Sequence, residues 1–140
     1  MSDTEVTTKP VNKLVQIDEM FGQERIKWTD KVKKLAYDLK DGDNLHEVAA
    51  YTLSYRQIIV ENIASIASKI RTNKAKLDRG FKEAWIRYYQ FEYKLNDKQR
   101  EKFIDADMSE DFQVQELLEA HKDFLTATVK TLDNMGFAIK

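Results

Sequence analysis

The chain has 140 residues, of which 42% are hydrophobic and 34% charged, and its formal net charge is −1. This length suits one domain, and a single proline with four glycines leaves too few breaks for a sheet-rich fold, so long helices are expected. The lack of cysteine excludes disulfides, thiolate zinc sites and a thiol nucleophile. No apolar run approaches the ~20 residues that cross a bilayer, and the polar N-terminus lacks the apolar region of a secretory signal. We therefore expect a soluble, intracellular protein that makes no membrane contact.

The first part of the chain is predicted to be a short arm followed by a helix. Residues 1–12 are rich in threonine and contain Pro10, which predicts a flexible N-terminal arm, and residues 13–140 are predicted to form a single helical domain. Spacings of four, three and four residues place an apolar stripe on the first helix, made of Trp28, Val32, Leu35 and Leu39. Gly42 within "KDGDN" predicts a turn at residues 40–44.

A much longer apolar stripe follows, and it predicts a helix from about Leu45 to about Tyr93. At 100° per residue its members fall within a sector of roughly 80°. They are Tyr55, Ile59, Ile63, Ile66, Ile70, Leu77, Phe81, Ala84, Tyr88, Phe91 and Leu95. Gly80 weakens this helix by about 1 kcal/mol relative to alanine without ending it. Such a helix would span ~75 Å, against a radius of gyration of ~14 Å for a compact chain of this size. We therefore predict an all-α fold, an elongated helical bundle built on one long central helix and oligomeric.

The rest of the chain is predicted to form two further helices. A short helix over residues 95–107 would begin at Asn96 or Asp97, which can cap its N-terminus. A break is expected at residues 107–109. A last helix, from about Glu110 to about Asn134, would end at Gly136.

The charges are distributed unevenly along the chain. Residues 69–102 hold eleven basic and five acidic residues, whereas residues 103–135 hold two basic and eight acidic residues. We assign a basic segment to residues 69–94 and an acidic C-terminal helix to residues 103–135. Two interpretations stay open: the two blocks pair with each other, within or between subunits, or the basic block faces a polyanion.

The basic segment also carries aromatic residues, and a helical wheel sorts its side chains into faces. Beside the apolar stripe, one face collects Lys69, Lys76, Arg79, Arg87 and Lys94. Another face holds Arg71, Lys74, Lys82, Trp85, Tyr89 and Tyr93. Cations that track phosphates and aromatic rings that stack on bases are what single-stranded nucleic acid requires. The alternative is that Trp85 and Tyr89 pack against another helix, with Lys82 and Arg71 extended around them.

No catalytic constellation is present in the sequence. It contains no glycine-rich phosphate loop and no HExxH motif. The only histidines, His46 and His121, are isolated, and we interpret them as a first-turn helix residue and as a residue packed between helices. We therefore expect a protein that is not an enzyme and uses neither cofactor nor metal.

Three passages together resemble the UvsY-like recombination mediators of T-even-type bacteriophages. They are "LHEVAAYTLSYRQIIVENIA" (45–64), the stretch from Lys69 to Tyr89, and "LDNMGFAIK" (132–140). The first looks like an early helix of that family with its Ala-Ala pair. The second is similar to its Lys-Ala-Arg-Leu-Asp-Tyr-Tyr DNA-binding motif, and the third to its Gly-Phe-Ala-Ile-Lys segment. The resemblance covers roughly residues 44–140.

The DNA-binding motif can be aligned in two ways. "KAKLD" (74–78) matches its front, which makes Lys74 and Lys76 the phosphate-contacting residues. "EAWIRYY" (83–89) instead matches its tyrosine pair, and Lys82 and Arg87 then substitute for the basic residues. We treat the cations and aromatics of this stretch as one candidate DNA-binding surface. It comprises Lys69, Arg71, Lys74, Lys76, Arg79, Lys82, Trp85, Arg87 and Tyr89.

The resemblance implies a function as well as a site. It implies a non-catalytic mediator that binds single-stranded DNA and helps to load the phage recombinase onto strands covered by the phage single-strand-binding protein. It also implies a homo-oligomer, a ring of six or seven subunits, in the cytoplasm of the infected bacterial host. The rival hypothesis is a structural or adaptor protein, a helical bundle whose basic and acidic blocks pair between subunits.

Overall fold

The computed structural model describes residues 12–90 and 96–139, and within these ranges it contains three helices and no strand. They are α2 (Lys13–Asp41), α3 (Leu45–Gln90) and α4 (Asp97–Ile139). The predicted all-α fold is therefore confirmed. The proposed arm lies outside the described residues except for Asn12, and so do Phe91, Tyr93, Lys94 and Leu95.

Each helix begins or ends at a residue suited to that position. The Asn12 side chain accepts a hydrogen bond from the Leu14 amide (2.9 Å) and caps α2. Gly42 ends α2 with a φ of 80°, a conformation that costs little only for glycine, and its amide donates to the Asp38 carbonyl. The predicted turn is thus confirmed.

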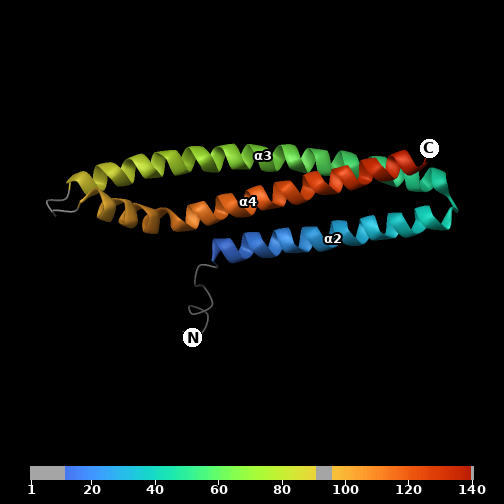
Figure 1. Cartoon of the computed structure of the whole chain (residues 1–140), viewed down its shortest axis with the longest axis horizontal. Coiled ribbons are helices and arrows are strands. Elements are labelled where there is room, and N and C mark those ends of the chain that lie inside the picture. The colour runs from blue at the N-terminus through green and yellow to red at the C-terminus, as the bar shows by residue number, and fades with distance from the viewer. Residues whose placement is uncertain (1–11, 91–95, 140) are drawn as a thin grey trace, which may run out of the picture.

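The helices lie side by side, but they overlap along only part of their length (Figure 1). α3 and α4 form an antiparallel pair, and α2 covers the part of this pair that includes the start of α3 and the end of α4. The first turns of α2 lie beside Gln113–Ala120 of α4. We call residues 13–70 and 113–139 the three-helix section, and residues 71–90 and 96–112 the two-helix end.

The predicted stripes form the core, which is divided in the same way. The three-helix section buries Trp28 and Leu35 of α2 against Ile59 of α3 and Leu125 of α4. A separate, smaller cluster in the two-helix end consists of Leu77, Ala84, Ile104 and Met108. Phe81, Trp85 and Tyr88 pack against this smaller cluster and are only partly buried.

The predicted break at residues 107–109 and the predicted end near Asn134 are wrong, because α4 is a single helix that continues to Ile139. Met108 explains the continuity, since it is buried against α3 and extends the apolar row that starts at Ile104. Gly136 lies inside the helix rather than at its cap. At the other end, the predicted cap at Asn96 is confirmed, because its side chain accepts the Gln99 amide (2.8 Å).

Gly80 has a packing role that the sequence did not reveal. A Cβ atom at this position would lie 2.7 Å from Cε of Met108. The absence of a side chain therefore lets α4 approach α3 closely where the smaller core cluster forms.

Candidate nucleic-acid interface

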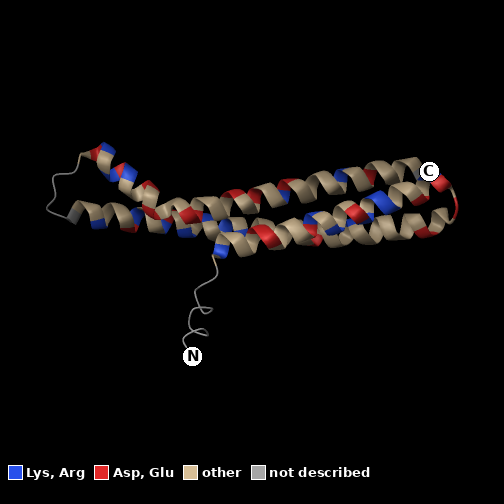
Figure 2. Ribbon diagram, turned by 90° about the horizontal axis from the view of Figure 1, so that it is seen from below, with Lys and Arg blue, Asp and Glu red and all other residues tan. Residues whose placement is uncertain are grey.

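The nine candidate residues lie on the last part of α3, and eight of them fall in the two-helix end. Lys69 is the exception, because it stands at the edge of the three-helix section, close enough to His121 to affect its charge state. Figure 2 shows that basic and acidic residues are interspersed along both helices of the two-helix end. α4 thus brings acidic side chains beside part of the basic segment.

One flank of α3 pairs with those acidic side chains. Lys76 Nζ lies 3.5 Å from Asp111 Oδ1, and Arg87 Nη2 lies 3.2 Å from Asp107 Oδ2. The Tyr88 hydroxyl donates to the same Asp107 carboxylate at 2.6 Å, and this hydrogen bond raises the pKa of Tyr88. We call Lys76 and Arg87 the acid-paired flank. Its existence means that the basic and acidic blocks do pair in part, within one chain.

The opposite flank of α3 has a different composition and carries no such pairs. Spacings of three, eight, three and four residues place its members on one side of the helix. They are Arg71, Lys74, Lys82, Trp85 and Tyr89, and we call this set the basic–aromatic face. The three cations are exposed, and none forms an ion pair within the described part of the chain. Arg79 is also exposed, and helical spacing places it between the two flanks.

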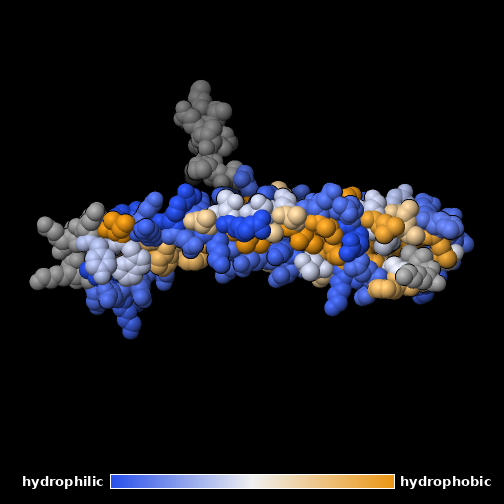
Figure 3. All heavy atoms as spheres, turned by 90° about the horizontal axis from the view of Figure 1, so that it is seen from above, coloured by the Kyte–Doolittle hydropathy of each residue, from blue (hydrophilic) through white to orange (hydrophobic). Residues whose placement is uncertain are grey.

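The two aromatic rings of this face differ in burial. Trp85 is half-buried against the core of the two-helix end, as the packing alternative expected, whereas Tyr89 is 60% exposed. Their ring centroids lie 5.6 Å apart with planes inclined by 33°. Figure 3 shows hydrophilic side chains beside side chains of intermediate hydropathy at this end, and patches of apolar side chains between hydrophilic ones further along the molecule.

Two residues at this surface were not among the candidates. Asp78 is exposed and lies on the same side of α3, four residues from Lys74 and four from Lys82. Arg100 comes from α4, and its guanidinium carbon lies 4.3 Å from the centroid of the Tyr89 ring. Helical spacing within α3 was sufficient to locate Asp78, but the position of Arg100 depends on how α4 packs against α3.

His121 packs between the helices as the sequence predicted. It is 1% exposed, its ring stacks on Phe21 with centroids 4.0 Å apart, and Nε2 lies 2.9 Å from Glu24 Oε2. Burial lowers the pKa of His121, although Glu24 opposes this effect. Nδ1 is buried, and no hydrogen-bond partner for it is found among the residues that the structure describes. His46, in contrast, is exposed in the first turn of α3.

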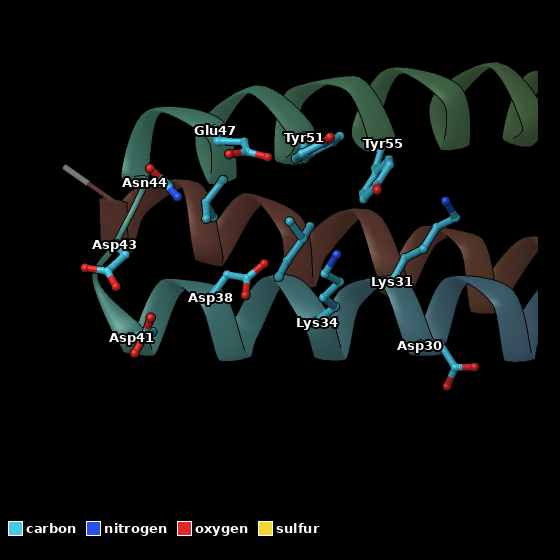
Figure 4. Close-up of a pocket in the computed structure, with 12 residues that line it drawn as sticks. Asp30, Lys31, Lys34, Asp38, Asp41, Asp43, Asn44, Glu47, Tyr51 and Tyr55 are labelled. Carbon is cyan, nitrogen blue, oxygen red and sulfur yellow. The ribbon is translucent and has the colours of Figure 1, made fainter.

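A pocket of about 630 Å³ opens between the end of α2 and the start of α3 (Figure 4). Asp38 and Lys34 extend from α2 toward α3, and Glu47 and Tyr51 of α3 also line the pocket. Lys31 Nζ lies 4.9 Å from the centroid of the Tyr55 ring and so already occupies one aromatic surface. The lining of this pocket mixes carboxylates, ammonium groups and two tyrosine side chains.

Two further properties concern metals and membranes. Across residues 12–90 and 96–139, no three His, Asp or Glu side chains are grouped so as to hold a metal ion. None of the described helices combines the length and the apolarity that a membrane-spanning helix requires.

Comparisons of the chain with protein-family models, with curated protein sequences and with solved structures find no match.

Proposed function

We propose that the chain binds single-stranded DNA on the basic–aromatic face and acts as a non-catalytic recombination mediator. The observation that carries this proposal is the separation of the two flanks. Lys76 and Arg87 face carboxylates of α4, whereas Arg71, Lys74 and Lys82 are exposed on the same side of α3 as Trp85 and Tyr89.

The chemistry of the face suits an extended strand rather than a folded ligand. Exposed cations gain affinity by releasing the counterions of phosphates, and aromatic rings stack on bases of any sequence. The two-helix end is also the part of the bundle that α2 leaves uncovered (Figure 1). A single strand of DNA can therefore reach the basic–aromatic face of α3 from Arg71 to Tyr89.

The resemblance to UvsY-like mediators supplies the rest of the proposal. In this role the chain helps a phage recombinase to load onto single strands covered by the phage single-strand-binding protein, in the host cytoplasm. The active form is an elongated bundle assembled into a homo-oligomeric ring. Apolar side chains that α3 leaves exposed support a protein contact of this kind, since Leu53 is 68% exposed and Ile58 42%.

The experiment is fluorescence anisotropy with labelled oligo-dT over a salt series. The double variant Lys74→Ala with Lys82→Ala should weaken binding and lower the slope of log K against log salt by about 0.7 for each lost phosphate contact. The matched control, Lys76→Ala with Arg87→Ala, removes the same charge from the acid-paired flank and should leave the slope nearly unchanged.

The double variant combines Lys74 with Lys82, two residues that neither alignment of the motif groups together. Each alignment instead groups one residue of the basic–aromatic face with one residue of the acid-paired flank. Wild-type protein that fails to bind at low salt would refute the proposal. A control variant that loses as much affinity as the double variant would show that binding is not confined to the basic–aromatic face.

Asp78 offers a test in the opposite direction. Its carboxylate lies among the cations of the face and repels phosphates, so Asp78→Asn should increase affinity for oligo-dT by a few-fold at low salt. The gain should vanish at high salt, where exposed charges are screened. Unchanged affinity at low salt would mean that oligo-dT does not bind on the basic–aromatic face.

The rival function is that of a structural or adaptor protein. The ion pairs of the acid-paired flank favour it, because they show that the two charged blocks are complementary. Pairing between subunits predicts that raised salt dissociates the oligomer and that oligo-dT does not compete with assembly. Light scattering across a salt series, with and without oligo-dT, distinguishes the two functions.

A further inference from the structure

Two hydrogen bonds cap the N-terminus of α4, which lies beside the end of α3. The Gln99 amide donates to the Asn96 side chain at 2.8 Å, and the Asn96 amide donates to the Gln99 side chain at 3.1 Å. These reciprocal hydrogen bonds form a capping box, which sets the direction in which the first turn leaves. Arg100, one residue further, therefore has a defined position relative to Tyr89.

The guanidinium of Arg100 is held on two sides. Its carbon lies 4.3 Å from the centroid of the Tyr89 ring, and Nη1 lies 3.1 Å from Asp97 Oδ1. The side chain is only 17% exposed, unlike the exposed cations of the basic–aromatic face. A planar guanidinium over an aromatic ring combines cation–π attraction with stacking, which a lysine ammonium does not reproduce.

This burial argues against a direct phosphate contact by Arg100. A phosphate-binding cation needs its charge at the surface, whereas the Arg100 side chain is largely buried and already contacts Tyr89 and Asp97. Tyr89 itself remains 60% exposed beside Trp85 although Arg100 lies over its ring. Arg100 therefore restricts the motion of Tyr89 and leaves part of the ring accessible to a ligand.

We propose that Arg100 is a positioning residue of the binding surface, which holds the Tyr89 ring in the orientation that stacks on a base. This inference rests on the proposed single-stranded DNA binding. It adds α4 to a site that would otherwise belong to α3 alone. Binding then depends on the closed arrangement of α3 and α4 at the two-helix end.

The test is a double-mutant cycle between Arg100 and Tyr89, read by oligo-dT anisotropy over the same salt series. Arg100→Ala should weaken binding roughly two- to tenfold, with an unchanged salt slope. In the Tyr89→Ala background, Arg100→Ala should have no further effect, because the ring that it positions is gone. Arg100→Lys should not restore affinity, since it keeps the charge without the planar group.

The matched control is Lys98→Ala, which removes an exposed cation from the same turn of α4 and should leave the affinity almost unchanged. Circular dichroism of each variant confirms that the helices are retained. A lower salt slope in Arg100→Ala, full rescue by lysine, or an equal loss in the Tyr89→Ala background would overturn the positioning role. These outcomes leave wild-type binding intact, whereas a wild-type chain that does not bind oligo-dT overturns the proposed function and this inference together.

Discussion

The three-helix section and the two-helix end are built from the same helices but enclose different cores. In the three-helix section, Ile59, Leu125 and Leu132 are completely buried, because a third helix closes the groove between the other two. In the two-helix end Ile104 is also completely buried, but the core is smaller, and Phe81 and Trp85, which pack against it, stay partly exposed. The third helix therefore gives the three-helix section the larger buried core, whereas the two-helix end combines a small core with partly exposed aromatic rings.

The largest expected effect separates the two cores directly. Leu125→Ala should lower the free energy of unfolding by about 2–5 kcal/mol, because the cavity would be enclosed by three helices. Leu77→Ala should cost less, because the two-helix end can relax or open locally without unfolding the rest. Urea unfolding followed by circular dichroism measures both. Equal losses would mean that the chain unfolds as one unit with no weaker end.

The next prediction concerns the buried histidine that joins α2 to α4. Because the pKa of His121 is lower in the folded chain than its usual value of about 6.5, the unfolded chain binds the extra proton first. The contribution of neutral His121 to the free energy of unfolding is fully present above a pH of about 6.5, the pKa in the unfolded chain. It decreases as the pH falls from there toward the folded pKa, by at most about 1.4 kcal/mol per pH unit for one proton.

The surroundings of His121 and a control variant define the measurement. Glu24 and Arg25 of α2 and Lys69 of α3 act on the ring, and the two cations add to the effect of burial. Denaturation between pH 7.5 and 5.5 should show a smaller pH dependence for His121→Asn than for the wild type. The exposed His46→Asn should match the wild type. A wild type that becomes more stable as pH falls would contradict the prediction.

The third prediction concerns the close approach at Gly80. In the wild type, Gly80→Ala should gain little, because the new methyl group displaces Met108 and so offsets the gain of about 1 kcal/mol in helix propensity. In a Met108→Ala background the space is open, so the same change should stabilise by about 1 kcal/mol. Urea unfolding of the four proteins measures this coupling. If the effects of Gly80→Ala and Met108→Ala on the free energy of unfolding were additive, the Met108 side chain would accommodate the new methyl group without a loss of stability.

The sequence was sufficient to predict features that depend on periodicity within one helix. The stripes from Trp28 to Leu39 and from Tyr55 to Tyr88 became core because an apolar row on a helix has to be covered. Features that depend on a second helix could not be predicted. The fit of Met108 against Gly80, which keeps α4 continuous, requires the register of α3 against α4.

The candidate site shows the same limit. Helical spacing placed Lys74 and Lys82 on one side of α3 and Lys76 and Arg87 on another. Only the position of Asp107 and Asp111 on α4 shows that one of these sides is paired with acids. Arg100 was missed for the same reason, because no pattern within α3 points to a residue of the returning helix.

The smallest expected effect tests whether the two flanks of α3 differ as argued. Lys76→Gln removes an ion pair of 3.5 Å whose side chains are 53% (Lys76) and 27% (Asp111) exposed, so it should cost between about 0.2 and 1 kcal/mol at low salt and less at high salt. Lys74→Gln removes an exposed cation without such a pair and should change stability by less than about 0.5 kcal/mol. Urea unfolding at two salt concentrations compares the free energies of unfolding of the two variants. In an Asp111→Asn background, the two lysine substitutions should have equal effects, because Lys76 has lost its partner. If Lys74→Gln were the more destabilising change, Lys74 would be part of the fold rather than a side chain left available for a partner.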